Sequence, residues 1–181
     1  EVNERIRTQL VSLLGSDKPA LRRETATTLG ILGARQAVPE MLAALGREGN
    51  DRLAEHAIIY ALIEIDDHNA TLKGLDHDNP QVQRGALVAL DQMDHGRLNV
   101  EQVVPLLDRA DSELQNAAMK VVASRPDWGT QIVGRVRDWL NDKQVPESRV
   151  TMLHAALLAF HRNHELEQSV AEALTGRETS L

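Results

Sequence analysis

The residues that most resemble a metal site lie near the end of the chain. His154 and His161 are seven residues apart, a spacing that places both on one face of a single helix, two turns apart. His161 and His164 form a His-x-x-His pair, with Glu165 four residues after His161, and such a set could hold zinc or nickel if another element supplied a carboxylate. No His-Glu-x-x-His motif is present, and Asn163 and His164 are expected to end the helix. We therefore expect surface histidines and no bound metal.

Two Asp-Trp pairs suggest a second chemistry, that of a lyase or glycosylase holding an exposed nucleotide against an aromatic ring. The candidate residues for it are Asp127, Trp128 and His56, and the second pair is Asp138 with Trp139. Such a site needs a basic cleft, whereas the chain carries 20 Lys and Arg against 27 Asp and Glu, a net charge of −7. We expect both tryptophans to pack in the core instead.

Other catalytic and cofactor classes lack their residues. Cysteine is absent, which excludes thiolate nucleophiles, disulfides, iron–sulfur clusters and covalently attached c-type haem from this segment. There is no Gly-x-Ser-x-Gly elbow and no glycine loop for a phosphate. The acidic stretches 66–68 and 76–79 lack the spacing of a calcium-binding EF-hand and are expected to cap helices. We predict no catalytic residues and no cofactor.

Nucleic acid and membrane are not expected as partners. An acidic chain with four aromatic residues offers neither a phosphate-binding surface nor a platform on which bases can stack. The longest apolar runs, such as 57–63, have the length of a buried helix face, well short of the roughly 18 residues of a membrane span. We predict no membrane insertion by this segment.

The elements that position these residues are repeated. When segment 19–30 is aligned with segment 80–91, Pro19 falls on Pro80, Leu21 on Val82, Arg23 on Arg84 and Leu29 on Leu90. Segments 52–62 and 112–122 join without gaps, and segment 148–158 fits more loosely. The closing apolar residues of the five segments are Leu29, Leu62, Leu90, Val122 and Leu158.

A second series of short amphipathic segments alternates with the first. Its members end at Leu14, Leu45, Leu75, Leu107, Leu140 and Leu174. Two interleaved series of about the same period indicate a unit of two helices, repeated about five times, that must stack on its neighbours to bury its apolar stripe. The pairs Ser16-Asp17, Asn50-Asp51, Asp78-Asn79 and Asp111-Ser112 are expected to cap helices of the first series. We predict an all-α, right-handed α-solenoid of about eleven helices, forming a single domain over 1–181 that is part of a longer protein.

Residues 15–42 carry a recognisable pattern: a polar turn, an Arg-bearing helix with Ala and Leu on its inner face, and a Val-Pro start of the next helix. This pattern resembles a HEAT-like repeat. More narrowly, residues 51–65 and 84–93 are similar to the HEAT segment of bacterial proteins described as membrane-bound dehydrogenases or multidomain c-type cytochromes. That resemblance implies a preceding β-propeller and a following haem-attaching Cys-x-x-Cys-His, neither of which lies in this segment.

Two columns of polar residues recur at equivalent positions of the repeats. The first contains Arg23, His56, Arg84 and Asn116. The second contains Arg22, Glu55, Gln83 and Gln115. Either the columns form a polar ribbon that contacts a partner, with Tyr60 as an anchor, or their side chains hydrogen-bond to adjacent turns and hold the repeats together.

These observations predict a non-catalytic scaffold or interaction module. Its concave face would bind a protein partner or a sibling domain of the same polypeptide through the two columns and Tyr60. One alternative is a structural spacer inside a large exported haem or redox protein, and the other is a HEAT-like lyase or DNA glycosylase. A free-standing protein would be cytoplasmic, whereas membership of the redox family would place it outside the cytoplasm.

Overall fold

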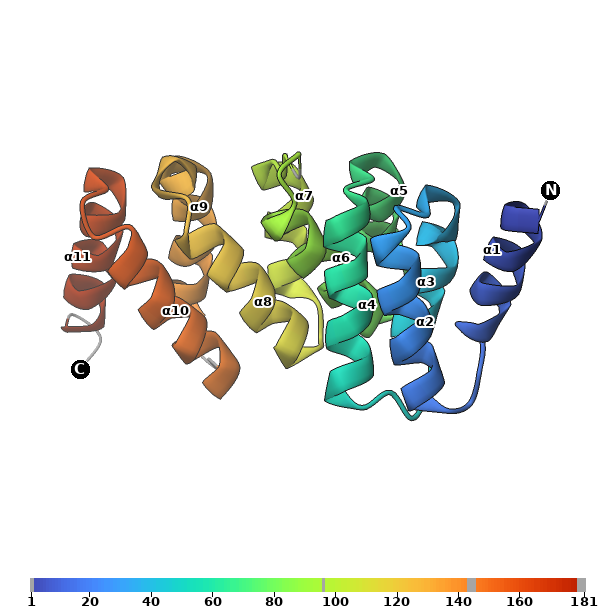
Figure 1. The fold of residues 1–181 in the computed structure, drawn as a ribbon. Helices are drawn as coiled ribbons and strands as arrows, with labels where there is room; N and C mark the ends of the chain where they lie inside the picture. The colour runs from blue at the N-terminus through green and yellow to red at the C-terminus, as the bar shows by residue number, and fades with distance from the viewer. Residues whose placement is uncertain (1, 96, 143–145, 179–181) are drawn as a thin grey trace. The chain divides into compact units, whose positions relative to one another are not determined.

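The chain is built from helices (Figure 1). The structure, a computed structural model, describes residues 2–95, 97–142 and 146–178, and within them all regular secondary structure is helical. The α-helices are α1 (Val2–Leu13), α2 (Pro19–Ile31), α3 (Val38–Leu45), α4 (Arg52–Ile65), α5 (His68–Leu72), α6 (Pro80–Gln92), α7 (Val100–Val103), α8 (Ser112–Ala123), α9 (Gly129–Asn141), α10 (Glu147–Ala159) and α11 (His164–Glu178). The 3-10 helices are η1 (Arg35–Ala37), η2 (Lys73–Asp76), η3 (Val104–Asp108) and η4 (Pro126–Trp128). The all-α class is confirmed for the described residues, which contain eleven α-helices where about eleven were expected.

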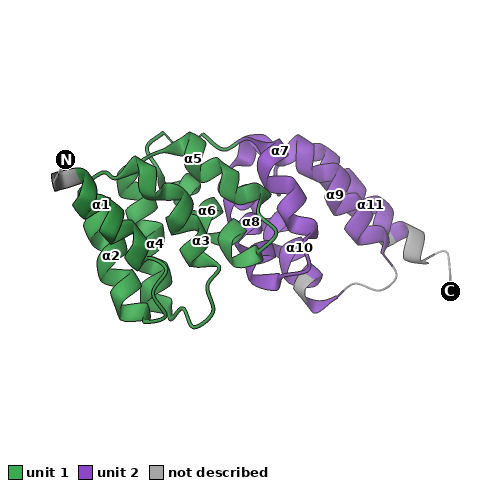
Figure 2. Cartoon of the chain, turned by 90° about the vertical axis from the view of Figure 1, so that its right-hand side faces the viewer, with its two compact units in different colours: residues 1–98 green, residues 99–181 purple. Residues whose placement is uncertain are grey.

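The chain divides into two compact units, residues 1–98 and residues 99–181 (Figure 2). Each unit alternates the two kinds of helix that the sequence pattern separates. The arrangement of all repeats as one domain over 1–181 stays a prediction.

In the first unit, α2, α4 and α6 stand side by side, with α3 and α5 behind them (Figure 1). The residues that close the repeated segments, Leu29, Leu62 and Leu90, are completely buried. They recur at the same helical position in each segment, so the periodicity of apolar residues sets the inward side of every helix. This part of the predicted pattern is confirmed.

The pair α2–α4 packs most closely at Gly30. A Cβ atom built on Gly30 would lie 3.0 Å from both the Cα and the Cβ of Ala61. Such contacts are tighter than most Cβ atoms make, so a residue larger than glycine would require α4 to move by a few tenths of an ångström.

Three of the four predicted caps are present. The side chains of Asp51, Asn79 and Asp111 accept hydrogen bonds from backbone N–H groups in the first turns of α4, α6 and α8. The fourth prediction is wrong, because the residue that precedes α2 is Lys18 and no side chain caps that helix. The first turn of α2 contains Pro19, which has no N–H and therefore leaves fewer donors to satisfy.

Two of the expected helices are short and end in a 3-10 turn. They are α5 followed by η2, and α7 followed by η3. Gly74 in η2 lies against α6 so closely that a Cβ there would be 2.6 Å from the Cβ of Ala86. In η3 the ring of Pro105 removes a backbone donor. These residues favour a tight turn over a longer α-helix.

In the second unit, α8 packs against α10 and α9 against α11. The register of the last repeat differs from the prediction: Leu158 is 77% exposed, and Phe160, two residues later, is buried at 2%. The Phe160 ring packs beside Gly129 at the start of α9, where a Cβ would lie 3.2 Å from the ring. The larger side chain therefore takes the core position in this loosely aligned segment. The side chain of Leu174 lies outside the described residues.

Candidate interaction face

The second polar column is mostly interior. Arg22, Gln83 and Gln115 are exposed by 0%, 2% and 7%. The side chain of each donates to a backbone carbonyl in the turn before its own helix: Arg22 to Ser16, Gln83 to Leu75 at 2.9 Å and Gln115 to Arg109 at 2.7 Å. The same position thus performs the same task in three repeats, and these three side chains stabilise turns.

Arg22 also joins two successive repeats. Its Nε donates to the Oδ1 of Asn50 at 2.9 Å, and the Nδ2 of Asn50 in turn donates to the carbonyls of Ala44 and Leu45 at the end of α3. Glu55 is the fourth member of the second column. Its carboxylate cannot donate a hydrogen bond to a turn carbonyl as the other three side chains do, and it instead pairs with Arg84 on the neighbouring helix at 2.8 Å.

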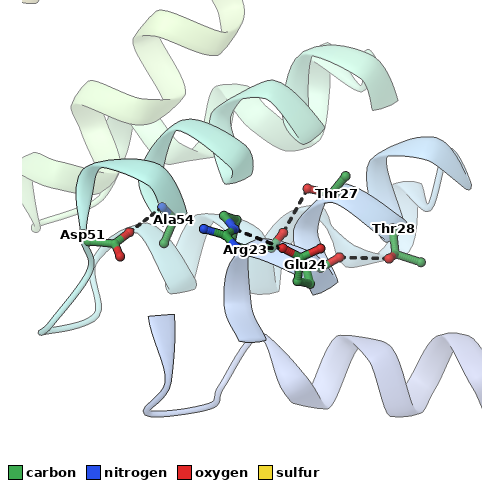
Figure 3. Close-up of polar contacts among 6 residues, drawn as sticks. All are labelled: Arg23, Glu24, Thr27, Thr28, Asp51 and Ala54. Atoms are coloured by element: carbon green, nitrogen blue, oxygen red, sulfur yellow. Dashed lines mark hydrogen bonds and ion pairs between the residues drawn. The ribbon is translucent and has the colours of Figure 1, made fainter. Parts of the chain in front are cut away.

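The first column is more accessible. The Arg23 side chain is 39% exposed, and its Nε and Nη2 both donate to Glu24, the next residue of α2 (Figure 3). Figure 3 also shows Thr27 and Thr28 donating to backbone carbonyls within α2. His56 is exposed and has no hydrogen-bond or ion-pair partner among the residues that the structure describes. In unit 1 the column therefore presents one paired arginine, one unpaired histidine and the Arg84–Glu55 pair.

Tyr60 lies one turn after His56 on the exposed side of α4, and its side chain is 55% exposed. Glu64, a turn further on, accepts a hydrogen bond from the Tyr60 hydroxyl, and this bond together with the negative charge raises the pKa of Tyr60.

Leu53 is a member of this face that the sequence analysis missed. It lies seven residues before Tyr60 on α4 and is 61% exposed. A spacing of seven residues returns to the same side of a helix. The polar residues on that side of α4 could therefore have indicated from the sequence that Leu53 is exposed. We define the α4 face as Leu53, His56 and Tyr60, with Arg23 on α2 and Arg84 on α6 beside it.

Asn116 lies in the second unit. It is exposed on α8, beside a groove of about 320 Å³ that α8 and α10 line together. The other lining residues are Met119, Lys120, Ala123, Thr151, Met152 and Ala155. Asn116 is therefore described apart from the α4 face.

The C-terminal histidines do not share a helix face. His154 lies on α10, but that helix ends at Ala159, so His161 falls in the following turn, where its Nδ1 lies 3.0 Å from the Leu158 carbonyl oxygen. Asn163 does not end a helix; its Oδ1 accepts from the Leu166 N–H in the first turn of α11, which begins at His164. Within residues 2–95, 97–142 and 146–178, no three His, Asp or Glu side chains are grouped to hold a metal ion.

The residues considered for nucleotide chemistry are either buried in the core or located in different units. Trp128 is 8% exposed, with the Arg125 guanidinium 5.0 Å from its ring centroid, and Trp139 is 2% exposed. Core packing of both tryptophans, as predicted, is confirmed. His56 lies in the first unit and Asp127 with Trp128 in the second.

The acidic stretch 66–68 serves the helix ends. Asp66 ends α4 in the left-handed conformation, with φ of 50°, and Asp67 accepts from the Ala70 N–H at the start of α5. His95, in the loop after α6, contacts the Asp66 carboxylate, and this hydrogen bond lowers the pKa of Asp66. The contact ties the end of α4 to that loop.

No protein-family model and no curated protein matches this chain. No helix in the described part of the chain combines the length and the apolar character needed to cross a membrane.

Proposed function

We propose that this chain is a HEAT-like, right-handed α-solenoid that acts as a non-catalytic interaction module, binding a protein partner or a sibling domain through the α4 face. The solenoid is supported by two recurrences: apolar residues close each repeated segment, and three buried donors bind the preceding turn in the same way. An array of this kind presents the exposed sides of successive helices as one preformed surface.

The observation that carries the binding proposal is the exposure of two large apolar side chains on one side of α4. Leu53 and Tyr60 are exposed by 61% and 55%, and they flank His56. Centres of protein interfaces favour tyrosine, and truncation of such an anchor commonly costs about 2 kcal/mol or more. Isolated exposed apolar residues are common, but two on the same helix face, two turns apart, form an anchor pair.

The surrounding charges favour a protein ligand over a polyanion. Arg23 is engaged by Glu24, and Arg84 by Glu55, so neither arginine offers an uncompensated charge. His56, within the face, has no hydrogen-bond or ion-pair partner among the described residues. The face can therefore surround an apolar contact with a balanced polar rim, which is the usual composition of a protein–protein interface.

The test compares three forms of the whole chain as baits in quantitative capture from extracts of the source cells: the wild type, the double variant Leu53→Ser with Tyr60→Ser, and Leu158→Ser. Leu158 is the matched control, because it is a 77% exposed leucine in the other unit. A specific partner should be retained by the wild type and by the control, and reduced at least tenfold by the double variant, since about 1.4 kcal/mol corresponds to tenfold.

All three forms should keep the helical circular dichroism of the wild type, because exposed substitutions change stability by only about 0.5 kcal/mol. If every captured protein is retained equally by the double variant, the α4 face is not the binding surface. A double variant that loses its helical signal would contradict the assignment of Leu53 and Tyr60 as surface anchors.

A further inference from the structure

The helix α1 exposes apolar side chains along one side. Ile6 and Leu13 are 48% and 37% exposed, and Leu10, which lies between them in the sequence, is half-buried. Spacings of four and three residues place the three side chains on one helix face. We define these residues as the α1 stripe. The first unit leaves this stripe largely uncovered.

The equivalent positions are buried in other helices of the second series. Aligning these helices on the leucines that close them pairs Leu13 with three residues that are at most 3% exposed, which are Ala44, Leu106 and Trp139. It pairs Ile6 with two residues that are at most 2% exposed, which are Ile132 and Leu166. The α1 stripe therefore has the composition of a core position, and another element is expected to cover it.

The second unit shows what covers this position in a later repeat. In α11, Ser169 lies one turn after Leu166 and accepts hydrogen bonds from the Arg137 side chain of α9, at 3.1 and 3.3 Å. This side of α11 packs against α9, which is the preceding helix of the same series. The cover is thus the outer side of another helix of the second series.

Positive charges flank the α1 stripe. Arg5 and Arg7 directly precede and follow Ile6, so a rotation of about 100° per residue places one arginine on each side of the stripe. The third charged residue of the described part of α1, Glu4, falls on the opposite face of the helix. Both arginines are exposed.

The outer side of α11 has the complementary arrangement. Gln168, Ala171 and Thr175 lie opposite the side that packs on α9, and all three are exposed. Glu167 and Glu172 flank this uncharged strip on its two sides and are also exposed. An apolar stripe between two arginines therefore has a counterpart in a strip of small and uncharged residues between two glutamates.

We propose that copies of this chain associate head to tail, with the α1 stripe of one copy packed on the outer side of α11 of the next. The small side chain of Ala171 leaves room for the stripe, and the flanking arginines pair with the flanking glutamates. An interface of this heterologous kind leaves one α1 and one α11 free in each dimer, so longer assemblies can form. The proposal rests on the repeat arrangement proposed above, but not on binding at the α4 face.

Sedimentation velocity of the full chain, at concentrations up to about 0.2 mM, detects association even through a small interface. Ile6→Ser with Leu13→Ser removes the apolar stripe. Ile31→Ser with Leu32→Ser is the matched control, because both residues are exposed apolar residues at the end of α2 in the same unit. We expect dimers and larger species for the wild type and the control, and association at least tenfold weaker for the stripe variant.

Charge reversal identifies the partner helix without changing the apolar contacts of α1. One variant carries Arg5→Glu with Arg7→Glu, and the other carries Glu167→Arg with Glu172→Arg. Each variant by itself should stay monomeric, because like charges then face each other across the interface. A mixture of the two should associate about as well as the wild type, since every contact between unlike variants is again complementary. Circular dichroism checks that all variants keep their helices.

Three results would overturn the proposal. They are a wild type that stays monomeric over the whole concentration range, a stripe variant that associates as the wild type does, and a reversal on α11 that has no effect. The third result would indicate that the stripe packs on another surface, such as α1 of the second copy. Leu53→Ser with Tyr60→Ser should leave the association unchanged, so a failure of this proposal can be distinguished from a failure of the proposed α4 face.

Discussion

Arg22 and Arg23 are adjacent in α2 and have opposite environments. Arg22 is fully buried and bonded to Ser16 and Asn50, whereas the side chain of Arg23 is 39% exposed and bonded to its neighbour Glu24. An exposed ion pair between adjacent residues contributes little, because water and salt screen it. A buried arginine that bridges two turns cannot be removed without leaving their polar groups unpaired.

We therefore predict that Arg22→Ala lowers the free energy of unfolding by roughly 2–4 kcal/mol, since it combines a cavity with lost buried hydrogen bonds. Arg23→Ala should change it by only about 0.5 kcal/mol. Urea denaturation followed by circular dichroism measures both. Equal losses in the two variants would show that the buried hydrogen bonds of Arg22 do not stabilise the first unit.

At the scale of elements, glycine positions decide how closely helices approach. Gly30 in α2 is covered by Ala61 of α4, and a Cβ added there would lie only 3.0 Å from the Cα and Cβ of Ala61. Gly134 in α9 is exposed, and a Cβ on it would meet no atom within 4 Å. The same residue type thus serves a packing role in one helix and has no packing role in the other.

The same substitution should have opposite effects at these two glycines. Gly30→Ala should destabilise the chain by about 1–3 kcal/mol, because the backbones of α2 and α4 must separate. Gly134→Ala should stabilise it by up to about 1 kcal/mol, because alanine is the better helix former. Thermal unfolding of the two variants gives the sign directly. A stabilising Gly30→Ala would contradict the close α2–α4 packing.

At the scale of the whole molecule, net charge distinguishes the proposed interaction module from the alternative of a nucleic-acid enzyme. The net charge is −7, and the two arginines beside the α4 face, Arg23 and Arg84, are paired with glutamates. Binding of a DNA backbone requires basic groups that displace its counterions.

We predict that the whole chain does not bind a fluorescent 20-base-pair DNA duplex at about 50 mM salt, as measured by fluorescence anisotropy. Low salt is chosen because it favours non-specific DNA binding. A strongly basic DNA-binding protein serves as the positive control. Binding that weakens steeply as salt increases would instead support the lyase or glycosylase alternative.

The sequence by itself determined the local features of this protein. The recurrence of Leu29, Leu62 and Leu90 predicted the helices and their buried sides, and the polar residues Asp51 and Asn79 predicted helix caps. These features follow from the helical period and from hydrogen bonds within one turn, which are properties of neighbouring residues. The absence of cysteine likewise excluded whole classes of chemistry without a structure.

Only the tertiary structure decided which polar residues face inward and which apolar residues stay exposed. Arg22 and Arg23 both flank the apolar stripe, so the helical period alone does not show which of them is buried. Arg22 is buried because the Ser16 carbonyl and the Asn50 side chain accept its hydrogen bonds. The exposure of Ile6 and Leu13 and the core position of Phe160 depend in the same way on contacts between separate helices. Such contacts join residues far apart in the chain, and no local pattern records them.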